Sequence, residues 1–168
     1  MWYRNTVSGI VSDKYYGIAG SSRVLWFTEA GTDTETGTVN LNYVKDENGV
    51  AVNEFNGITP LGDACLVFTN KGYRIVHPEK GDVIEPVENP ELVFTGKCIT
   101  DGNRVIISEA HTGKITVVNF ADKTNPVVEL RLDTPYITDI PCVMDGEIYV
   151  PLRHDGILKI TKNKTKVK

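Results

Sequence analysis

Four short apolar runs recur along this chain at nearly equal intervals. They contain Val24, Leu66, Val105 and Ile148, which are separated by 42, 39 and 43 residues if these positions are taken as equivalent. This period lies within the roughly 40 to 50 residues typical of propeller blades. Because a repeated unit that cannot bury its own apolar face must stack on further copies, the period predicts an array of similar sheets.

Turn residues stand on both sides of each run. Gly-Ser, Gly-Asp or Asp-Gly pairs precede the runs, and each run is followed by a glycine and a further β-type segment. Such residues tolerate the positive φ of tight hairpins. Two hairpin turns in each unit therefore predict three consecutive antiparallel strands. The glycines that follow the runs are Gly31, Gly72, Gly113 and Gly156.

A fourth strand is predicted between units, where residues 51–55, 82–85 and 127–132 alternate apolar with polar side chains. The segments before the runs, such as 16–19 and 97–100, carry small residues that suit a crowded inner strand. The predicted fold class is therefore all-β, a β-propeller of about four four-stranded antiparallel blades. The expected blades are residues 13–55, 56–93, 94–134 and 135–168 together with 1–7, in a single domain over 1–168.

Closure of the ring has several solutions. Four blades can close on themselves, the chain can form part of a larger ring, or it can be a piece of a longer polypeptide. The last unit is short of residues for an outer strand after Thr161. We expect residues 2–7 to supply that strand, because joining the two ends would remove an exposed edge.

The composition of the chain favours some kinds of partner and environment over others. A net charge of −4 and the lack of a dense Lys/Arg stripe do not favour nucleic acid, whose binding depends on phosphate contacts. Five lysines between 159 and 168 indicate a solvated terminus or a contact with an acidic partner. No secretion signal or apolar stretch of about 18 residues is present, so we expect no membrane insertion. The three cysteines, Cys65, Cys98 and Cys142, are an odd number without metal-binding spacing and lie in apolar segments, which predicts free, buried thiols.

Polar residues cluster at the turns expected between second and third strands. His111 and His154 occupy the same position in the repeat, six residues after Val105 and Ile148. In a propeller these turns and the connections between blades emerge on one face, where ligands commonly bind. The candidate ligand face comprises Glu29, Asp33, Asn70, Lys71, Glu109, His111, Arg153, His154 and Asp155.

Catalysis is not predicted at this face. Turns of neighbouring blades lie on the order of 10 Å apart, whereas metal–nitrogen bonds are near 2.1 Å. No Gly-x-Ser-x-Gly elbow or cofactor motif occurs, so we expect no catalytic, metal or cofactor site. The alternative is a hydrolase-type enzyme, which requires convergence of side chains among Glu109, His111, His154 and Asp155.

Two segments carry a family resemblance. Residues 23–31, Arg-Val-Leu-Trp-Phe-Thr-Glu-Ala-Gly, and residues 56–68, Asn-Gly-Ile-Thr-Pro-Leu-Gly-Asp-Ala-Cys-Leu-Val-Phe, resemble paired blades of the tail nozzle proteins of short-tailed bacteriophages, also called tail tubular protein B. The resemblance covers roughly residues 20–80 and brings no catalytic residues. Residues 101–105 and 145–149 are similar to further strands of the same family.

The resemblance implies a non-enzymatic structural or docking role in a phage tail or virion, with several copies arranged around the tail. The implied partners are other virion or tail proteins or a host-surface ligand, and the implied location is the virion, or the cytoplasm before assembly. The alternative is a propeller that binds a glycan or a protein through its loop face.

Overall fold

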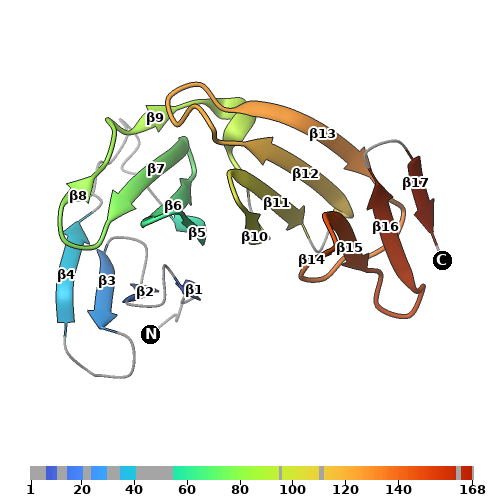
Figure 1. Cartoon of the computed structure of the whole chain (residues 1–168), viewed down its shortest axis with the longest axis horizontal. Helices are drawn as coiled ribbons and strands as arrows, with labels where there is room; N and C mark the ends of the chain where they lie inside the picture. Colours follow the sequence, from blue (N-terminus) through green and yellow to red (C-terminus); the bar gives the residue numbers. More distant parts are fainter. Residues whose placement is uncertain are drawn as a thin grey trace, which may run out of the picture. The chain divides into compact units, whose positions relative to one another are not determined.

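The computed structural model describes residues 7–10, 15–20, 24–29, 35–40, 55–94, 96–109, 112–161 and 164–167. Regular structure within these ranges is β-strand, apart from one short 3-10 helix, η1 (Pro90–Leu92) (Figure 1). The predicted all-β fold class is confirmed. The chain divides into two compact units, residues 1–95 and 96–168, and each is described by itself. One domain over 1–168 stays a prediction.

The first unit contains two antiparallel sheets. The first sheet has four strands in the order β1-β2-β3-β4: β1 (Val7–Ile10), β2 (Tyr15–Gly20), β3 (Val24–Glu29) and β4 (Glu35–Asn40). The second sheet runs β5-β6-β7 and then has a divided outer edge: β5 (Phe55–Leu61), β6 (Ala64–Thr69), β7 (Gly72–His77), β8 (Gly81–Asp82) and β9 (Val87–Glu88).

The second unit contains two four-stranded antiparallel meanders. The third sheet comprises β10 (Lys97–Asp101), β11 (Arg104–Glu109), β12 (Lys114–Asn119) and β13 (Val127–Asp133). The fourth comprises β14 (Cys142–Met144), β15 (Glu147–Pro151), β16 (Ile157–Thr161) and β17 (Lys164–Val167). Both sheets have the strand order of a propeller blade.

An apolar core joins the third and fourth sheets. Ile106 and Val117 of the third sheet are fully buried with Val150 and Leu158 of the fourth, in one hydrophobic cluster. Burial of this kind is worth roughly 25 cal/mol per Å² of apolar surface. Packing of one sheet on the next is therefore what stabilises the second unit.

Burial along the second strand differs between sheets. All six residues of β6 are buried, and so are the four central residues of β11. Such strands are covered on both faces. In β15, by contrast, Ile148 and Val150 are buried while Glu147, Tyr149 and Pro151 are only half-buried. One face of the fourth sheet therefore remains accessible.

The predicted order of strands in the first sheet was wrong. Val24 begins the third strand of its sheet, whereas Leu66, Val105 and Ile148 lie in second strands. The reason is that β1, rather than residues 16–19, is the first strand of the first sheet. An apolar run looks alike in a second and a third strand, because both are central in the sheet.

The predicted outer strands also differ in part. Residues 82–85 do not form one strand: β8 ends at Asp82, and Pro86 has no N–H to continue the ladder before β9. Residues 127–132 do form a strand, β13. Of the strand expected at 51–55, only Phe55 is described, and it opens β5.

The prediction that residues 2–7 supply the outer strand of the last unit was also wrong. The outer strand of the fourth sheet is β17, which comes from the C-terminal segment and pairs with β16. Val7, the last residue of the segment expected to form that strand, lies in β1 and pairs with Ala19 of β2. Residues 2–6 lie outside the described residues.

Candidate protein-interaction surface

The connection from β13 to β14, residues 134–141, packs against the β11–β12 turn of the third sheet. Thr138 is fully buried, and its Oγ1 accepts a hydrogen bond of 2.7 Å from the buried Ser108 Oγ. The Asp139 N–H donates to the Pro151 carbonyl at 2.9 Å, which also attaches the connection to the end of β15. These bonds fix the connection at one end of both sheets.

Gly113 allows the connection to approach the turn closely. Its φ is +69°, and a Cβ at this position would lie 2.3 Å from the Thr134 carbonyl oxygen and 2.6 Å from that of Tyr136. Separations this short do not occur for real side chains, so the approach requires glycine. The Thr134 N–H also donates to the Gly113 carbonyl at 3.1 Å. The repeated glycine of the sequence thus has a specific packing role here.

Two large apolar side chains remain exposed on this fixed connection. Ile137 and Ile140 are 45% and 50% exposed, although Thr138 between them is buried. Ordered apolar residues in contact with water are typical of surfaces that bind another protein. We call Lys97, Ile137, Asp139, Ile140 and Arg153 the connection surface.

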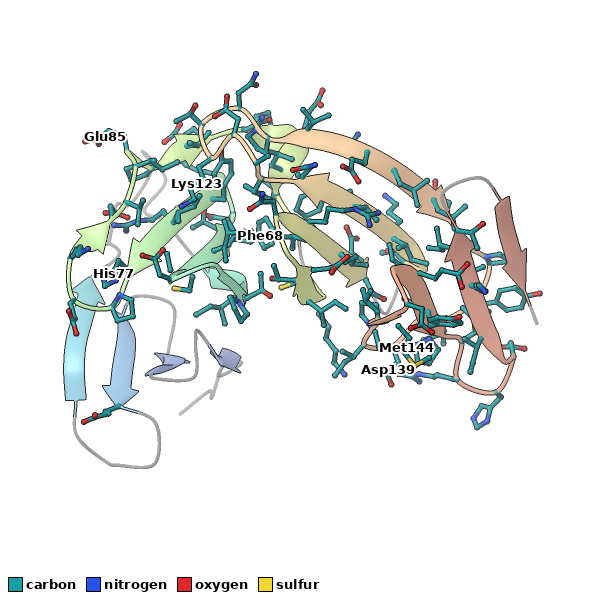
Figure 2. The ribbon with its side chains drawn as sticks, viewed as in Figure 1. Phe68, His77, Glu85, Lys123, Asp139 and Met144 are labelled. Atoms are coloured by element: carbon teal, nitrogen blue, oxygen red, sulfur yellow. The ribbon has the colours of Figure 1, made fainter. Side chains whose placement is uncertain are left out.

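An ion pair lies at the centre of the connection surface. Lys97 Nζ is 3.0 Å from Asp139 Oδ1, so the first residue of β10 contacts the connection (Figure 2 labels Asp139). The Lys97 hydrogen bond holds the pKa of the Asp139 carboxyl below its ordinary value, with further contributions from the Ile140 N–H and the charges of Lys97 and Arg153. Asp139 is therefore a stable anion, well suited to electrostatic recognition and poorly suited to accepting protons.

The predicted ligand face lies partly at this surface. Glu109 ends β11, and its Oε2 accepts a hydrogen bond of 3.1 Å from Thr112 Oγ1 within the turn. Arg153, His154 and Asp155 are exposed in the β15–β16 turn. In the second unit, as expected, turns between second and third strands share an end of the sheets with the connection.

The remaining predicted residues lie in the first unit or outside the described residues. Asn70 and Lys71 form the β6–β7 turn, where Lys71 Nζ lies 3.2 Å from Glu88 Oε1 of β9. Glu29 is exposed at the end of β3, between third and fourth strands rather than second and third. Asp33 and His111 lie outside the described residues.

Sequence reasoning missed Lys97, Ile137, Asp139 and Ile140. The ion pair joins residues 42 positions apart, and no local pattern connects them. One signal was available: residues 134–141 follow an alternating strand yet contain two isoleucines, a combination unusual for a purely solvated loop.

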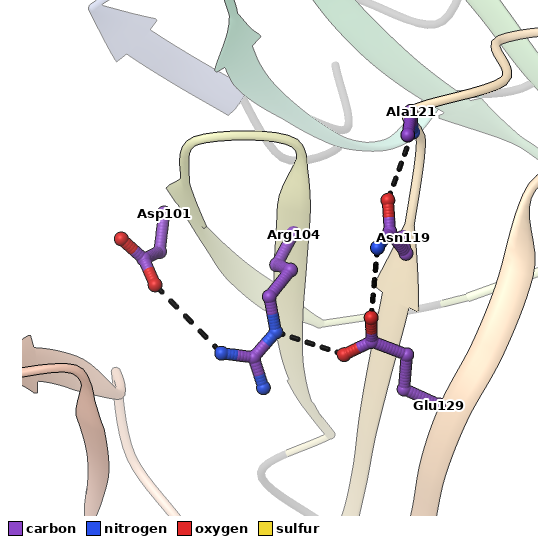
Figure 3. A network of polar contacts seen from close by, with 5 residues as sticks. All are labelled: Asp101, Arg104, Asn119, Ala121 and Glu129. Carbon is purple, nitrogen blue, oxygen red and sulfur yellow. Dashed lines mark hydrogen bonds and ion pairs between the residues drawn. The ribbon is translucent and has the colours of Figure 1, made fainter.

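The opposite end of the third sheet carries a different polar network (Figure 3). Arg104 Nε lies 2.8 Å from Glu129 Oε2, and the Asn119 amide donates to Glu129 Oε1 at 2.8 Å. Asp101 Oδ2 lies 3.8 Å from an Arg104 guanidinium nitrogen. These contacts join all four strands of the third sheet, and the polar groups pair with one another. The polar residues at this end are therefore explained by their role in holding the strands together.

Within the described ranges, no three His, Cys, Asp or Glu side chains gather closely enough to hold a metal ion. No helix among the same residues is long and apolar enough to cross a membrane. The reactive-looking groups of the second unit, Glu109, His154 and Asp155, have no hydrogen bond or ion pair to one another among the contacts described above.

No protein-family model and no curated protein sequence matches the chain. Several solved structures, in contrast, are similar to this chain. BamB from Moraxella catarrhalis has a TM-score of 0.59 and 19% identity, with 92% of this chain and 44% of that chain covered. The Pan2 WD40 domain from Neurospora crassa has a TM-score of 0.60 and 8% identity, with 97% and 47% covered. BBS1N, solved in complex with ARL6DN, has a TM-score of 0.64 and 10% identity, with 96% and 53% covered.

These similarities, together with the blade-like meanders, define the class: the chain has a β-propeller fold. It spans about half the length of the structures that it matches. The propeller part of the family resemblance is thus supported, whereas none of these three structures is a phage tail nozzle protein.

Proposed function

We propose that this chain is a non-enzymatic interaction module that docks a protein partner through the connection surface. The observation that carries the proposal is the fixed position of two exposed isoleucines beside the buried Ser108–Thr138 hydrogen bond. A rigid apolar surface loses little conformational entropy on binding, which favours affinity. The Lys97–Asp139 pair at its centre adds charge-dependent specificity.

We further propose that the partner is a bacteriophage tail or virion protein and that the chain resides in the virion after assembly in the cytoplasm. The similarity of residues 23–31 and 56–68 to tail nozzle blades supports this choice. A glycan on the host surface is the second candidate ligand of the same surface. It is less favoured, because exposed aliphatic side chains suit a protein partner better than a sugar.

A binding measurement with the proteins encoded beside this chain tests the proposal. The wild-type chain should bind a neighbouring portal or tail-adaptor protein, and the double variant I137E/I140E should weaken that binding at least tenfold, because both anchors are lost. V127E is the matched control: Val127 is 62% exposed and lies at the start of β13, away from the connection. Equal binding by I137E/I140E and wild type would contradict the proposed surface.

The enzyme alternative has its own test. It requires Glu109, His154 and Asp155 to act together with His111, so the triple variant E109Q/H154A/D155N would abolish any hydrolytic activity found for the wild-type chain. We propose instead that the chain has no such activity. Hydrolysis of a glycan or ester substrate that is lost in the triple variant would contradict this.

A further inference from the structure

The turn between β15 and β16 holds an arginine in a backbone conformation that arginine rarely adopts. Arg153 has a φ of +54°, which lies in the left-handed region. This region brings the Cβ close to the following carbonyl oxygen, so it is unfavourable for residues other than glycine and, to a smaller degree, Asn and Asp. Arg153 therefore makes the turn less stable than Asn or Gly would at the same position.

Among the described residues, the one other non-glycine residue with a positive φ is Asp145. Its φ is also +54°, and Gly146 follows it at +74° in the turn between β14 and β15. Asp followed by Gly is the residue pair that tight hairpin turns favour. The φ of Asp145 is thus explained by turn chemistry, whereas the φ of Arg153 is not.

Hydrogen bonds fix the backbone of the β15–β16 turn. The Leu152 N–H donates to the Gly156 carbonyl at 2.8 Å, and the Asp155 N–H donates to the Leu152 carbonyl at 3.0 Å. Leu152 is fully buried in the apolar cluster that the third and fourth sheets share. Arg153 is the next residue, so its backbone position is well defined although its side chain is exposed.

No contact within the fold explains the Arg153 side chain. It has no hydrogen bond or ion pair to any residue in the part of the chain that the structure describes. The Lys97 hydrogen bond is the largest cause of the lowered pKa of the Asp139 carboxyl, and the charge of Arg153 adds to it, so Arg153 lies near Asp139. Asp139, however, already has Lys97 as its ion-pair partner at 3.0 Å. The guanidinium group of Arg153 is therefore available to another molecule.

Arg153 lies beside the exposed apolar part of the connection surface. The Asp139 N–H donates to the Pro151 carbonyl at 2.9 Å, so the connection meets the end of β15 two residues before Arg153. Ile140, which follows Asp139, is 50% exposed. Arginine is enriched among the interface residues that contribute most to binding. Strained backbone at non-glycine residues is also concentrated at binding sites, where function retains it.

We propose that Arg153 determines which partner binds the connection surface, by forming two parallel hydrogen bonds to the carboxylate of an acidic side chain that apolar residues flank. The planar guanidinium matches a carboxylate in this geometry, and the exposed isoleucines contact the flanking residues. A nucleic-acid phosphate is less favoured, because the chain has a net charge of −4 and Asp155 lies in the same turn. This role of Arg153 rests on docking at the connection surface, so the experiment measures the two separately.

The variant R153N separates binding from folding. Asn tolerates the left-handed region, so the thermal unfolding midpoint should rise by about 1–4 °C. The same variant should bind the neighbouring portal or tail-adaptor protein about tenfold more weakly, because the charge-assisted hydrogen bonds are lost. A residue with a purely structural role would not lower affinity while raising stability. D145N is the matched control: it replaces a charged residue of the same φ at the opposite end of β15 and should bind as wild type does.

Two further variants test the charge of the partner group. R153E should weaken binding more than R153N, because two carboxylates would then face each other. R153K should lie between R153N and wild type, since lysine keeps the charge but lacks the planar fork. Added NaCl should weaken wild-type binding more steeply than binding by R153N, because salt screens the ion pair that only wild type forms.

The outcomes distinguish this role from docking itself. Wild-type affinity in R153N, with I137E/I140E still weakened, would overturn the role of Arg153 and leave the connection surface intact. Absence of wild-type binding, or wild-type affinity in both R153N and I137E/I140E, would contradict docking at the surface and with it this role. Tighter binding by R153E than by R153N would show a basic partner group and overturn the carboxylate. Equal weakening by D145N, or a lower unfolding midpoint in R153N, would overturn the functional explanation of the Arg153 backbone.

Discussion

Ser108 Oγ donates a buried hydrogen bond of 2.7 Å to Thr138 Oγ1, and this bond joins β11 to the connection between the third and fourth sheets. Both side chains are buried. Since the two residues lie 30 positions apart, the bond orders a segment that carries exposed isoleucines on either side of Thr138. The buried Ser108–Thr138 hydrogen bond thus determines the position of the connection surface.

Removal of the Thr138 hydroxyl should destabilise the second unit. T138V keeps the volume but leaves the Ser108 hydroxyl without its partner, and an unsatisfied buried polar group costs about 1–3 kcal/mol. Urea unfolding followed by circular dichroism measures this free energy. The double variant S108A/T138V should recover part of the loss, because neither polar group then remains. A double variant less stable than the sum of the single variants would contradict this explanation.

Alanine should be tolerated much less at Gly113 than at Gly102. Both glycines have positive φ, +69° and +60°, so both variants incur the left-handed strain of about 1–2 kcal/mol. Only at Gly113 does the new Cβ meet carbonyl oxygens of the connection; at Gly102 nothing lies within 4 Å. We expect G113A to lose about 1–3 kcal/mol more than G102A. Equal unfolding midpoints would show that the close approach has no energetic importance.

The Asp139 carboxyl should titrate below its ordinary pKa of 3.8. A lowered pKa in the folded state means that the carboxylate contributes stability above the ordinary pKa, and this contribution is lost as the pH falls through the folded value. Carbon-detected NMR titration measures the pKa directly. In K97M it should rise toward the ordinary value, because the Lys97 hydrogen bond is the largest cause of the shift. An unchanged pKa in K97M would exclude the ion pair in solution.

The cysteines should differ sharply in reactivity. Burial raises the pKa of Cys65 to about 12, so its thiol is protonated and inaccessible at pH 8. The prediction of buried thiols was wrong for the other two: Cys98 is half-buried, and Cys142 is exposed at the start of β14. Iodoacetamide labelling followed by mass spectrometry should therefore modify Cys142 in the folded chain and Cys65 only after denaturation. Rapid labelling of Cys65 under native conditions would contradict the packing of β6.

The sequence predicted where strands occur better than it predicted the place of each strand within its sheet. The turn–run–turn pattern located β11 and β15 correctly, because hairpin residues and apolar alternation are local signals. It could not distinguish the second strand from the third in the first sheet, since both are apolar and flanked by turns. The short strand β1 was missed for a related reason: Val-Ser-Gly-Ile contains only two apolar residues.

The candidate surface was predicted only in part. Arg153 and His154 were expected on a loop face, because their turn repeats the position of the turn in the preceding unit. Asp139 and its isoleucine neighbours belong to a connection with no repeat equivalent. Their exposure depends on the burial of Thr138 against Ser108, a tertiary contact that no local pattern encodes.

Hydrogen–deuterium exchange of the chain with and without its bound partner tests the central claim most directly. The account predicts slower exchange over residues 134–141 and the β15–β16 turn on binding, with no change at the Arg104–Glu129 end of the third sheet. Protection confined to that opposite end, with residues 134–141 exchanging as in the free chain, would contradict the connection surface as the site of docking.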